Sequence, residues 1–575
     1  MADAKLAWPI TEQVSRLRQR QTGPLILELD LTEGMPEGPV TDPLSAIMSL
    51  RKVRLPDVIE GLRRASHDDR VRALVVKVGG GRIGLARVQE LREAVTRFRE
   101  SGKLTVAWAE TFGEFAGGNV PYYLATAFDR IYLQTSGSLG LTGVAVEQLF
   151  WHDALAKAGV AFQSAKRHEY KTAADNLTER GLTEPGREAT QRVADSVTEQ
   201  ISAAIAERRG KSPEEARALL ERGPFLPTEA LAEGLIDAIG YRDEVYADVR
   251  KDAGKGAVLQ FVTRYQRARV LAQRARQLPN PRERFVAVLY ATGPIKGGRS
   301  TRSPLGGGAM GSDTVAAALR SARSDDRVRA VLLRVNSPGG SATASDTIWR
   351  EVVRLRNAGK PVVVSMSDVA ASGGYAISMA ADVIVAQPGT ITGSIGVIAG
   401  KPVFADALER IGVTIDGVAL GSNATMFAPT HPFTDQEWER LNRWMDAIYR
   451  DFIEKVAEGR RMPVDKVHDV ARGRVWTGAD AVRNGLVDEL GGLADAAAIA
   501  RRRAGLPSDA PLRVFPRLTA LDQLRPPESS ESRPAAAPAA GLSFAEAWGP
   551  AWRLAAQAGF SPYGPLALPG RWIIH

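Results

Sequence analysis

An internal duplication is the feature of this chain that most constrains its fold. Residues 68–73, Asp-Asp-Arg-Val-Arg-Ala, recur letter for letter at 325–330, an offset of 257 positions (325 − 68). The same offset separates Gly102-Lys103 from Gly359-Lys360. Matches that recur in order along a chain predict two copies of one folding unit.

Each copy alternates short apolar runs with amphipathic stretches. In the second copy, the runs that predict buried strands are 285–290, 331–335, 362–365 and 383–386, and the stretches that predict helices are 347–357 and 435–459. This alternation indicates parallel sheets covered by helices, an α/β class.

A chain of 575 residues is too long for one core. We divide it into an N-terminal segment, a first repeat, an Arg-rich helical linker, a second repeat, and a Pro/Ala-rich linker with an aromatic tail; these are residues 1–21, 22–250, 251–282, 283–506 and 507–575.

Composition excludes several kinds of chemistry. The chain has no cysteine, which rules out disulfides, thiol nucleophiles and cysteine-ligated metals. The net charge of +9 comes from scattered arginines and does not predict nucleic-acid binding. No run reaches the ~18 apolar residues of a membrane span, and none has the form of a signal peptide. We therefore expect a chain that stays in the cytoplasm unless a peripheral contact holds it at the membrane.

The two copies differ after one predicted strand. In the second copy, the strand 331–335 is followed by Asn-Ser-Pro-Gly-Gly-Ser at 336–341, whereas the first copy has Gly-Gly-Gly-Arg at 79–82. A strand that ends in Pro-Gly-Gly can turn sharply and expose backbone N–H groups, as an oxyanion hole requires. A plain strand-to-helix turn is the alternative.

Ser372 is the candidate nucleophile. It lies in Ala-Ser-Gly-Gly at 371–374, where a helical pattern begins, and small neighbours would let a substrate backbone approach. The aligned residue of the first copy is Asn119. A simple helix N-cap is the alternative function of Ser372.

A nucleophilic serine needs a base. The chain has six histidines, and none lies in a recognisable triad pattern. A lysine kept neutral by burial could replace histidine. The residues alone do not indicate which lysine.

The motif order Ser-Pro-Gly-Gly, Ala-Ser-Gly-Gly-Tyr and Thr-Gly-Ser-Ile-Gly-Val, at 337–340, 371–375 and 392–397, in a duplicated chain resembles the long form of bacterial signal peptide peptidase A. The resemblance covers about 22–506. It implies two tandem crotonase-like ββα domains, related to the Clp protease proteolytic subunit, and a serine protease with a Ser–Lys dyad.

The resemblance also assigns residues. The family serine matches Ser372, and the family lysine matches Lys171 in the string Tyr-Lys-Thr-Ala at 170–173. The second copy has Ser422 at the aligned position, so each copy would supply half of the dyad. Gly340 and Gly373 match the oxyanion donors.

Ser394 matches a serine that positions the lysine in this family. A turn residue is the alternative for Ser394, because Ser138 is its counterpart in the first copy.

The implied enzyme cuts cleaved signal peptides or other extended peptides at the bacterial membrane and assembles as a homotetramer. The resemblance implies no cofactor and no metal. The long form commonly starts with a membrane anchor that is not seen here. Phe544, Trp548 and Trp552 share one helical face that could meet a membrane interface or pack on the body.

Two other functions remain open at this stage. A crotonase-like enzyme would use paired backbone donors for acyl-CoA chemistry, with carboxylates beside them. A membrane-associated scaffold would keep the pocket without catalysis.

Overall fold

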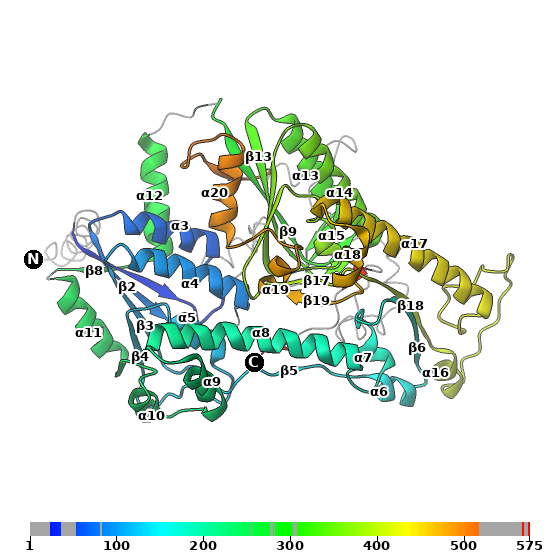
Figure 1. The fold of residues 1–575 in the computed structure, drawn as a ribbon, viewed down its shortest axis with the longest axis horizontal. Helices are drawn as coiled ribbons and strands as arrows, with labels where there is room; N and C mark the ends of the chain where they lie inside the picture. The colour runs from blue at the N-terminus through cyan, green and yellow to red at the C-terminus, as the bar shows by residue number, and fades with distance from the viewer. Residues whose placement is uncertain are drawn as a thin grey trace, which may run out of the picture.

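A computed structural model describes residues 23–35, 53–80, 83–254, 256–276, 280, 282–302, 308–516, 566–567 and 573–574. Two parallel sheets lie side by side, each covered by helices, and one long helix passes beneath both (Figure 1). The architecture confirms the α/β class and the two tandem units predicted from the sequence.

The first sheet belongs to the N-terminal repeat. All its pairings are parallel, in the order β7-β4-β3-β2-β1-β8. Its strands are β1 (Leu25–Asp30), β2 (Val71–Lys77), β3 (Leu104–Ala109), β4 (Arg130–Leu133), β7 (Ala238–Ile239) and β8 (Val258–Phe261). Helices α3 (Leu55–Ser66), α4 (Leu85–Arg99), α5 (Asn119–Ala125) and α11 (Arg242–Ala253) follow these strands and bury their apolar faces against them.

The second sheet repeats this arrangement in the order β20-β16-β15-β13-β9-β21, again parallel. Its strands are β9 (Phe285–Thr292), β13 (Val328–Ser337), β15 (Val362–Ala371), β16 (Val383–Ala386), β20 (Glu489–Leu490) and β21 (Leu512–Val514). The C-terminal end of β15 also pairs in parallel with β17 (Ile391–Gly393), which pairs antiparallel with β19 (Val475–Thr477). The covering helices include α13 (Ser312–Ser324), α14 (Ala342–Asn357) and α20 (Leu493–Arg503).

The repeated Gly-Lys pairs have one structural role. The Nζ of Lys103 donates to the carbonyls of Ala65 and Asp68, at 2.5 and 2.8 Å. The Nζ of Lys360 donates to the carbonyls of Ala322 and Asp325, at 3.0 and 2.8 Å. Each lysine therefore ties the C-terminal end of a helix to the start of the strand that follows the lysine. The duplication thus extends to individual hydrogen bonds.

The predicted elements of the second repeat are present. The runs 285–290, 331–335, 362–365 and 383–386 lie in β9, β13, β15 and β16. The helix expected at 435–459 is α17 (Asp435–Arg460), and the helix expected from 347 starts at Ala342, because Ser341 caps it by accepting from the Ala344 amide.

Part of the arginine-rich segment joins the first repeat. Strand β8 pairs with β1, and α12 (Val262–Arg276) buries Val262 and Tyr265 in the first core. Arg269 of this helix forms an ion pair with Asp68. The segment expected to link the repeats therefore supplies an edge strand, as β21 does for the second repeat.

One arm of the first repeat crosses to the second. Strand β6 (Ala161–Arg167) pairs antiparallel with β18 (Val397–Val403), from Arg167 opposite Val397 to Ala161 opposite Val403. Helix α8 (Glu184–Arg209) packs Ala189 and Val193 on the second repeat, while its C-terminal half lies in the first core. Figure 1 shows α8 beneath both sheets.

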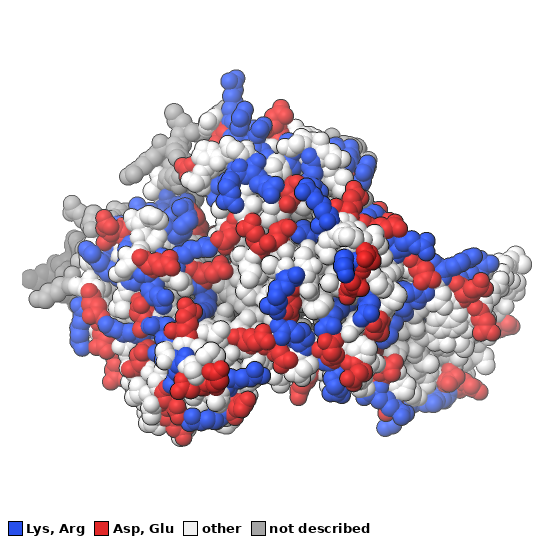
Figure 2. Space-filling view, viewed as in Figure 1, with Lys and Arg blue, Asp and Glu red and all other residues white. Residues whose placement is uncertain are grey.

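Within the described residues, none of the helices combines the length and apolarity needed to cross a membrane. The aromatic tail residues Phe544, Trp548 and Trp552 lie outside the described residues. Lysine, arginine and carboxylate side chains are interspersed over the face shown in Figure 2.

Candidate active site

Ser372 stands at the turn between β15 and the short helix α15 (Gly373–Ala376). Its φ is +56°, which is unusual for a residue with a Cβ, and its amide donates to the Gly393 carbonyl at 2.8 Å. The side chain is fully buried. The sheet therefore holds this serine in a strained conformation at the end of β15. Neighbouring parallel strands end at the same edge of the sheet and place other residues close to it.

Lys171 reaches this serine from the other repeat. Its Nζ lies 2.9 Å from Ser372 Oγ, 2.9 Å from Ser394 Oγ and 3.1 Å from the Ser394 carbonyl. The side chain is fully buried. These three partners are neutral oxygens, and burial holds the pKa of the Lys171 amine well below its usual value of 10.5.

Gly473 was not identified from the sequence, yet it packs directly on Lys171. A Cβ at this position would lie 2.5 Å from both the Lys171 Cβ and its amide nitrogen. Its φ of +86° is also suited to glycine. The only sequence signal is a glycine between Arg472 and Arg474, whose guanidinium groups lie over the ring of Tyr170.

Gly340 and Gly373 lie side by side near the serine. Strand β14 (Gly339–Gly340) pairs with β10 (Ile295–Lys296), and a Cβ on Gly340 would collide with the Ile295 carbonyl. A Cβ on Gly373 would lie 3.1 Å from the Gly340 nitrogen. The Gly373 amide belongs to the first turn of α15, where amides have no partner within the helix.

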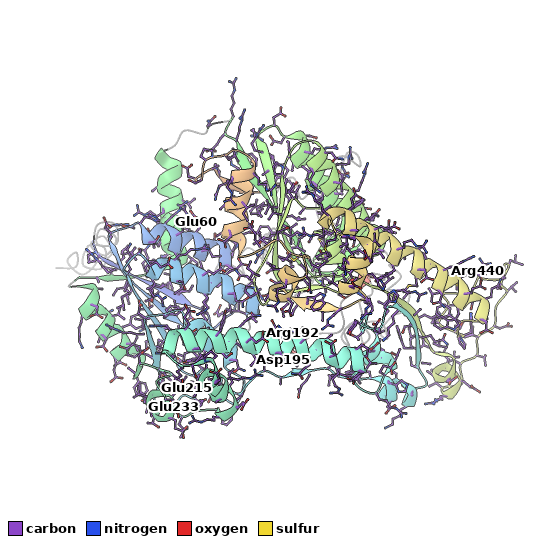
Figure 3. The ribbon with its side chains drawn as sticks, in the orientation of Figure 1. Glu60, Arg192, Asp195, Glu215, Glu233 and Arg440 are labelled. Carbon is purple, nitrogen blue, oxygen red and sulfur yellow. The ribbon has the colours of Figure 1, made fainter. Side chains whose placement is uncertain are left out.

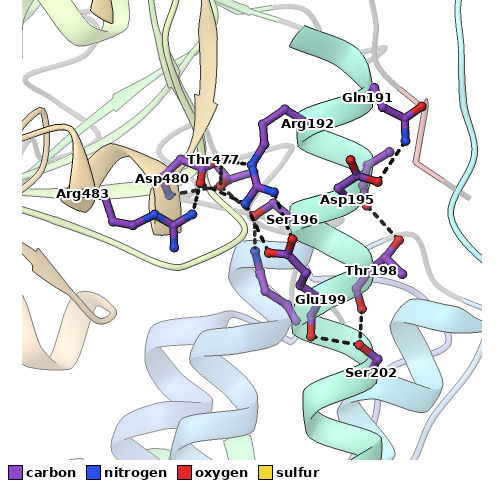
Figure 4. A network of polar contacts seen from close by, with 12 residues as sticks. Gln191, Arg192, Asp195, Ser196, Thr198, Glu199, Ser202, Thr477, Asp480 and Arg483 are labelled. Atoms are coloured by element: carbon purple, nitrogen blue, oxygen red, sulfur yellow. Dashed lines mark hydrogen bonds and ion pairs between the residues drawn. The ribbon is translucent and has the colours of Figure 1, made fainter. Parts of the chain in front are cut away.

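Ion pairs hold the two repeats together around Lys171 and Ser372. Arg334 of β13 donates to Glu90 of α4 at 2.5 Å, and both side chains are about 1% exposed. Arg192 of α8 binds Asp480 in the first turn of helix α19 (Gly478–Arg483). It also binds Glu199, seven residues later on α8 (Figure 4). Because α8 follows the Lys171 loop, these contacts fix the lysine relative to Ser372.

The residues aligned with Ser372 and Lys171 in the opposite repeats, Asn119 and Ser422, have other surroundings. Asn119 is buried and structural, because its Nδ2 donates to the Gly143 carbonyl at 2.7 Å and its Oδ1 accepts from the Thr142 amide. Ser422 lies in an exposed loop, where its Oγ accepts from Asn423. Of the histidines, His168 contacts the site only through its carbonyl, which accepts from the Lys171 amide.

Sequence comparison places this geometry in a family. The profile of peptidase family S49 matches residues 97–255 and 354–507. The chain belongs to peptidase family S49. It is therefore a serine protease, the class predicted from the sequence, and this assignment favours a peptidase over an acyl-CoA enzyme or a scaffold.

Relatives match most of the chain. "Serine protease SPPA, chloroplastic" of Arabidopsis thaliana is 32% identical over 79% of this chain and 66% of that protein. "Protease 4" of Haemophilus influenzae is 31% identical over 78% of this chain and 72% of its own length, and "Protease 4" of Salmonella typhi is 32% identical over 80% and 73%.

Among solved structures, a ClpP1 mutant from Listeria monocytogenes aligns over 36% of this chain and 94% of its own, with 16% identity and a TM-score of 0.24.

Proposed function

We propose that this family S49 member is an endopeptidase in which Lys171 is the general base and Ser372 the nucleophile. The observation that carries the proposal is the 2.9 Å contact between Lys171 Nζ and Ser372 Oγ in a fully buried setting. A neutral amine at this distance can accept the hydroxyl proton. Burial lowers the pKa of this amine, which favours the neutral form that can act as a base.

The reaction proceeds through an acyl-enzyme. Lys171 takes the proton of Ser372, whose Oγ attacks the peptide carbonyl. The amides of Gly340 and Gly373 donate to the tetrahedral oxyanion. The lysine then returns the proton to the leaving amine, and later activates the water that releases the acyl group. Ser394 positions the amine by accepting one of its hydrogens.

The substrate main chain adds as an extended strand beside β14. This edge already takes an antiparallel strand of the same chain, β22 (Leu566–Ala567), with Gly340 opposite Leu566. Because β14 consists of two glycines, backbone contacts dominate there. Extended peptides are therefore the expected substrates.

Cleaved signal peptides are our proposed physiological substrates, at the cytoplasmic face of the bacterial membrane. A relative from Enterococcus faecium, matched over 31% of this chain, carries the description "Putative signal peptide peptidase SppA". We propose a homotetramer that contacts the membrane peripherally.

The dyad can be tested with a serine-reactive fluorophosphonate and a fluorogenic peptide. Wild-type enzyme should be labelled at Ser372, and Lys171→Met should lose both labelling and peptidase activity while keeping its thermal unfolding transition. Lys401→Met is the matched control, because Lys401 is also buried but donates to the carbonyls of Met426 and Ala428. Full labelling of Lys171→Met, or labelling at another serine, would remove the dyad assignment.

A further inference from the structure

Three aromatic rings meet beside the loop that carries Lys171. His168 lies in this loop, Tyr449 on α17 and His468 on α18 (Val464–Val470). The His168 ring lies 4.6 Å from the Tyr449 ring and 5.0 Å from the His468 ring, between centroids and edge to face. The Tyr449 and His468 rings are 5.9 Å apart. This aromatic cluster joins the arm of the first repeat to two helices of the second.

Tyr449 is the most buried member of the aromatic cluster. Arg440, near the start of α17, lies at the outer end of the molecule in Figure 3, and Tyr449 follows nine residues later (449 − 440). Its side chain is 6% exposed, and burial raises the pKa of its phenol to about 12. The hydroxyl therefore keeps its hydrogen and can both donate and accept.

The Tyr449 hydroxyl connects α17 to the turn formed by Arg472 and Gly473. Its oxygen accepts from the Arg472 amide at 3.4 Å and lies 3.0 Å from His468 Nδ1. An amide nitrogen can only donate, so the hydroxyl hydrogen is left for His468 Nδ1. That nitrogen accepts when the imidazole is neutral and carries its hydrogen on Nε2. The hydroxyl and the imidazole together therefore orient the Arg472 amide.

The turn at 472–473 supports the lysine backbone. Arg472 and Gly473 have φ values of +50° and +86°, and a Cβ on Gly473 would lie 2.5 Å from the Lys171 amide nitrogen. The Arg472 carbonyl accepts from the His168 amide at 3.4 Å, and the His168 carbonyl accepts from the Lys171 amide at 3.0 Å. A displacement of this turn would therefore move the lysine.

The same turn is bonded to the segment that carries Ser394. The Gly473 amide donates to the Ile395 carbonyl at 2.8 Å, and the Ser394 amide donates to the Arg474 carbonyl at 2.6 Å. Ser394 in turn accepts from Lys171 Nζ. The conformation of the turn thus sets both the lysine backbone and one of the oxygens that hold its amine.

The first repeat has the same Arg-Gly pair with different residues around it. Arg222 and Gly223 are aligned with it, 250 positions earlier (473 − 223), but Gly223 has a φ of −65°. Offsets of 251, 250 and 251 relate α8 to α17, the two Arg-Gly pairs, and Lys171 to Ser422. By these offsets, the residues aligned with Tyr449, His468 and His168 are Thr198, Ala218 and Ala419.

The aromatic cluster therefore accompanies the lysine and not the fold. Ion pairs also border it, since Glu169 binds Arg472 at 3.2 Å and Arg167 binds Asp446 at 2.5 Å. Each of these pairs has an exposed partner, so solvent and salt weaken the attraction. The contact through the buried Tyr449 hydroxyl is shielded from both.

We propose that Tyr449 and His468 are positioning residues for Lys171. Their hydrogen-bonded pair holds the Arg472–Gly473 turn, and the turn sets the distance between Lys171 Nζ and Ser372 Oγ. The inference rests on the proposed function, in which Lys171 is the base. It adds two residues that touch neither the reacting atoms nor the amine.

Tyr449→Phe tests the hydroxyl, because this change keeps the ring. We expect kcat on a fluorogenic peptide to fall about tenfold, KM to change less than about twofold and the unfolding temperature to stay near that of the wild type. A displaced amine is better hydrated, so the acid limb of kcat/KM should move to higher pH. Tyr246→Phe is the control, because the Tyr246 hydroxyl donates to Glu28 in the first repeat at 2.8 Å. A wild-type kcat and an unmoved acid limb in Tyr449→Phe would overturn the proposal.

Two variants at position 468 separate hydrogen bonding from packing. A glutamine side chain can accept the Tyr449 hydrogen through its oxygen, whereas a leucine side chain cannot. His468→Gln should keep most of the wild-type kcat, and His468→Leu should lower it about tenfold. Equal losses in the two variants would contradict the role of His468 as the acceptor.

Comparison with Lys171→Met separates this inference from the dyad. If Lys171→Met is inactive and Tyr449→Phe is unimpaired, only the positioning role fails. If Lys171→Met is fully active, the base assignment fails and the positioning role fails with it. In the double variant Tyr449→Phe/Gly473→Ala, the loss of kcat should be smaller than the product of the two single losses, because both changes act through one turn. Losses that multiply would contradict the inference.

Discussion

The two repeats keep the same frame and differ in chemistry. In each, a buried tyrosine after the nucleophile position donates to a distant carbonyl: Tyr122 to Leu235 at 2.6 Å and Tyr375 to Leu486 at 2.9 Å. In each, an arginine ending the long helix binds an aspartate, Arg209 to Asp237 and Arg460 to Asp488. Contacts that set the fold are therefore retained in both copies, whereas Lys171 and Ser372, the proposed reactive pair, come one from each copy.

Exchanging the aligned residues Ser372 and Asn119 between the repeats should have the largest effect on peptidase activity. Ser372→Asn places the residue of the first repeat in the second, and removes the hydroxyl that we propose as the nucleophile. We expect peptidase activity to fall by at least about a thousandfold, with the fold intact. The reverse change, Asn119→Ser, should create no second labelling site, because the second repeat has Ser422 at the position aligned with Lys171. Fluorophosphonate labelling followed by peptide mapping measures both.

One position carries an ion pair in both repeats, but at different depth. Arg334 binds Glu90 in the interior, whereas Lys77, 257 positions earlier (334 − 77), binds Glu110 at the surface at 2.9 Å. Arg334→Met removes the cation that Glu90 binds in the interior and should lower the free energy of unfolding by about 3–5 kcal/mol.

Lys77→Met, at the matched surface position, should cost about 0–1 kcal/mol. Urea denaturation of the two variants compares them. Equal losses would show that Glu90 is not held by Arg334 alone.

Gly473 packs against the backbone of Lys171, so a side chain at this position would displace the lysine. Gly473→Ala would push the Lys171 backbone from Ser372, and we expect kcat to fall by about tenfold to a hundredfold with little change in KM. Gly359→Ala is the control: Gly359 has a similar φ of +73° but open space around its Cα. If both variants lose the same activity, backbone strain alone explains the effect.

The smallest effect concerns pH and stability. In the proposed mechanism the neutral amine is the active form, so kcat/KM should rise with pH through a pKa well below 10.5. The unfolded chain binds a proton that the folded Lys171 releases, so this group's contribution to stability increases as pH rises from the lowered pKa to 10.5.

At neutral pH, Lys171→Met should therefore raise the unfolding temperature slightly while abolishing activity. Thermal unfolding across a pH series checks the sign. An unfolding temperature that falls at neutral pH would mean that the amine stabilises the fold.

The sequence predicted much of this frame because its signals are local. The duplication and the apolar runs identified the sheets, and the Gly-rich turns pointed to Ser372 as the candidate nucleophile. Lys171 required the family resemblance, because it lies 201 positions from Ser372 and comes from the other repeat. Gly473 was missed because its role is a contact with a distant backbone, which no spacing reveals. The crossing of β6 and α8 to the second repeat could not be read from the sequence either, because it depends on contacts between distant parts of the chain.

The crossing of α8 from the first repeat to the second affects when the site can form during synthesis of the chain. The N-terminal repeat leaves the ribosome first with an amine that has no hydroxyl to activate. Ser372 emerges 201 positions later and stays inert until its own sheet has folded and received that arm. With the proposed dyad, peptidase activity therefore arises only after both repeats have been synthesised and have folded against each other.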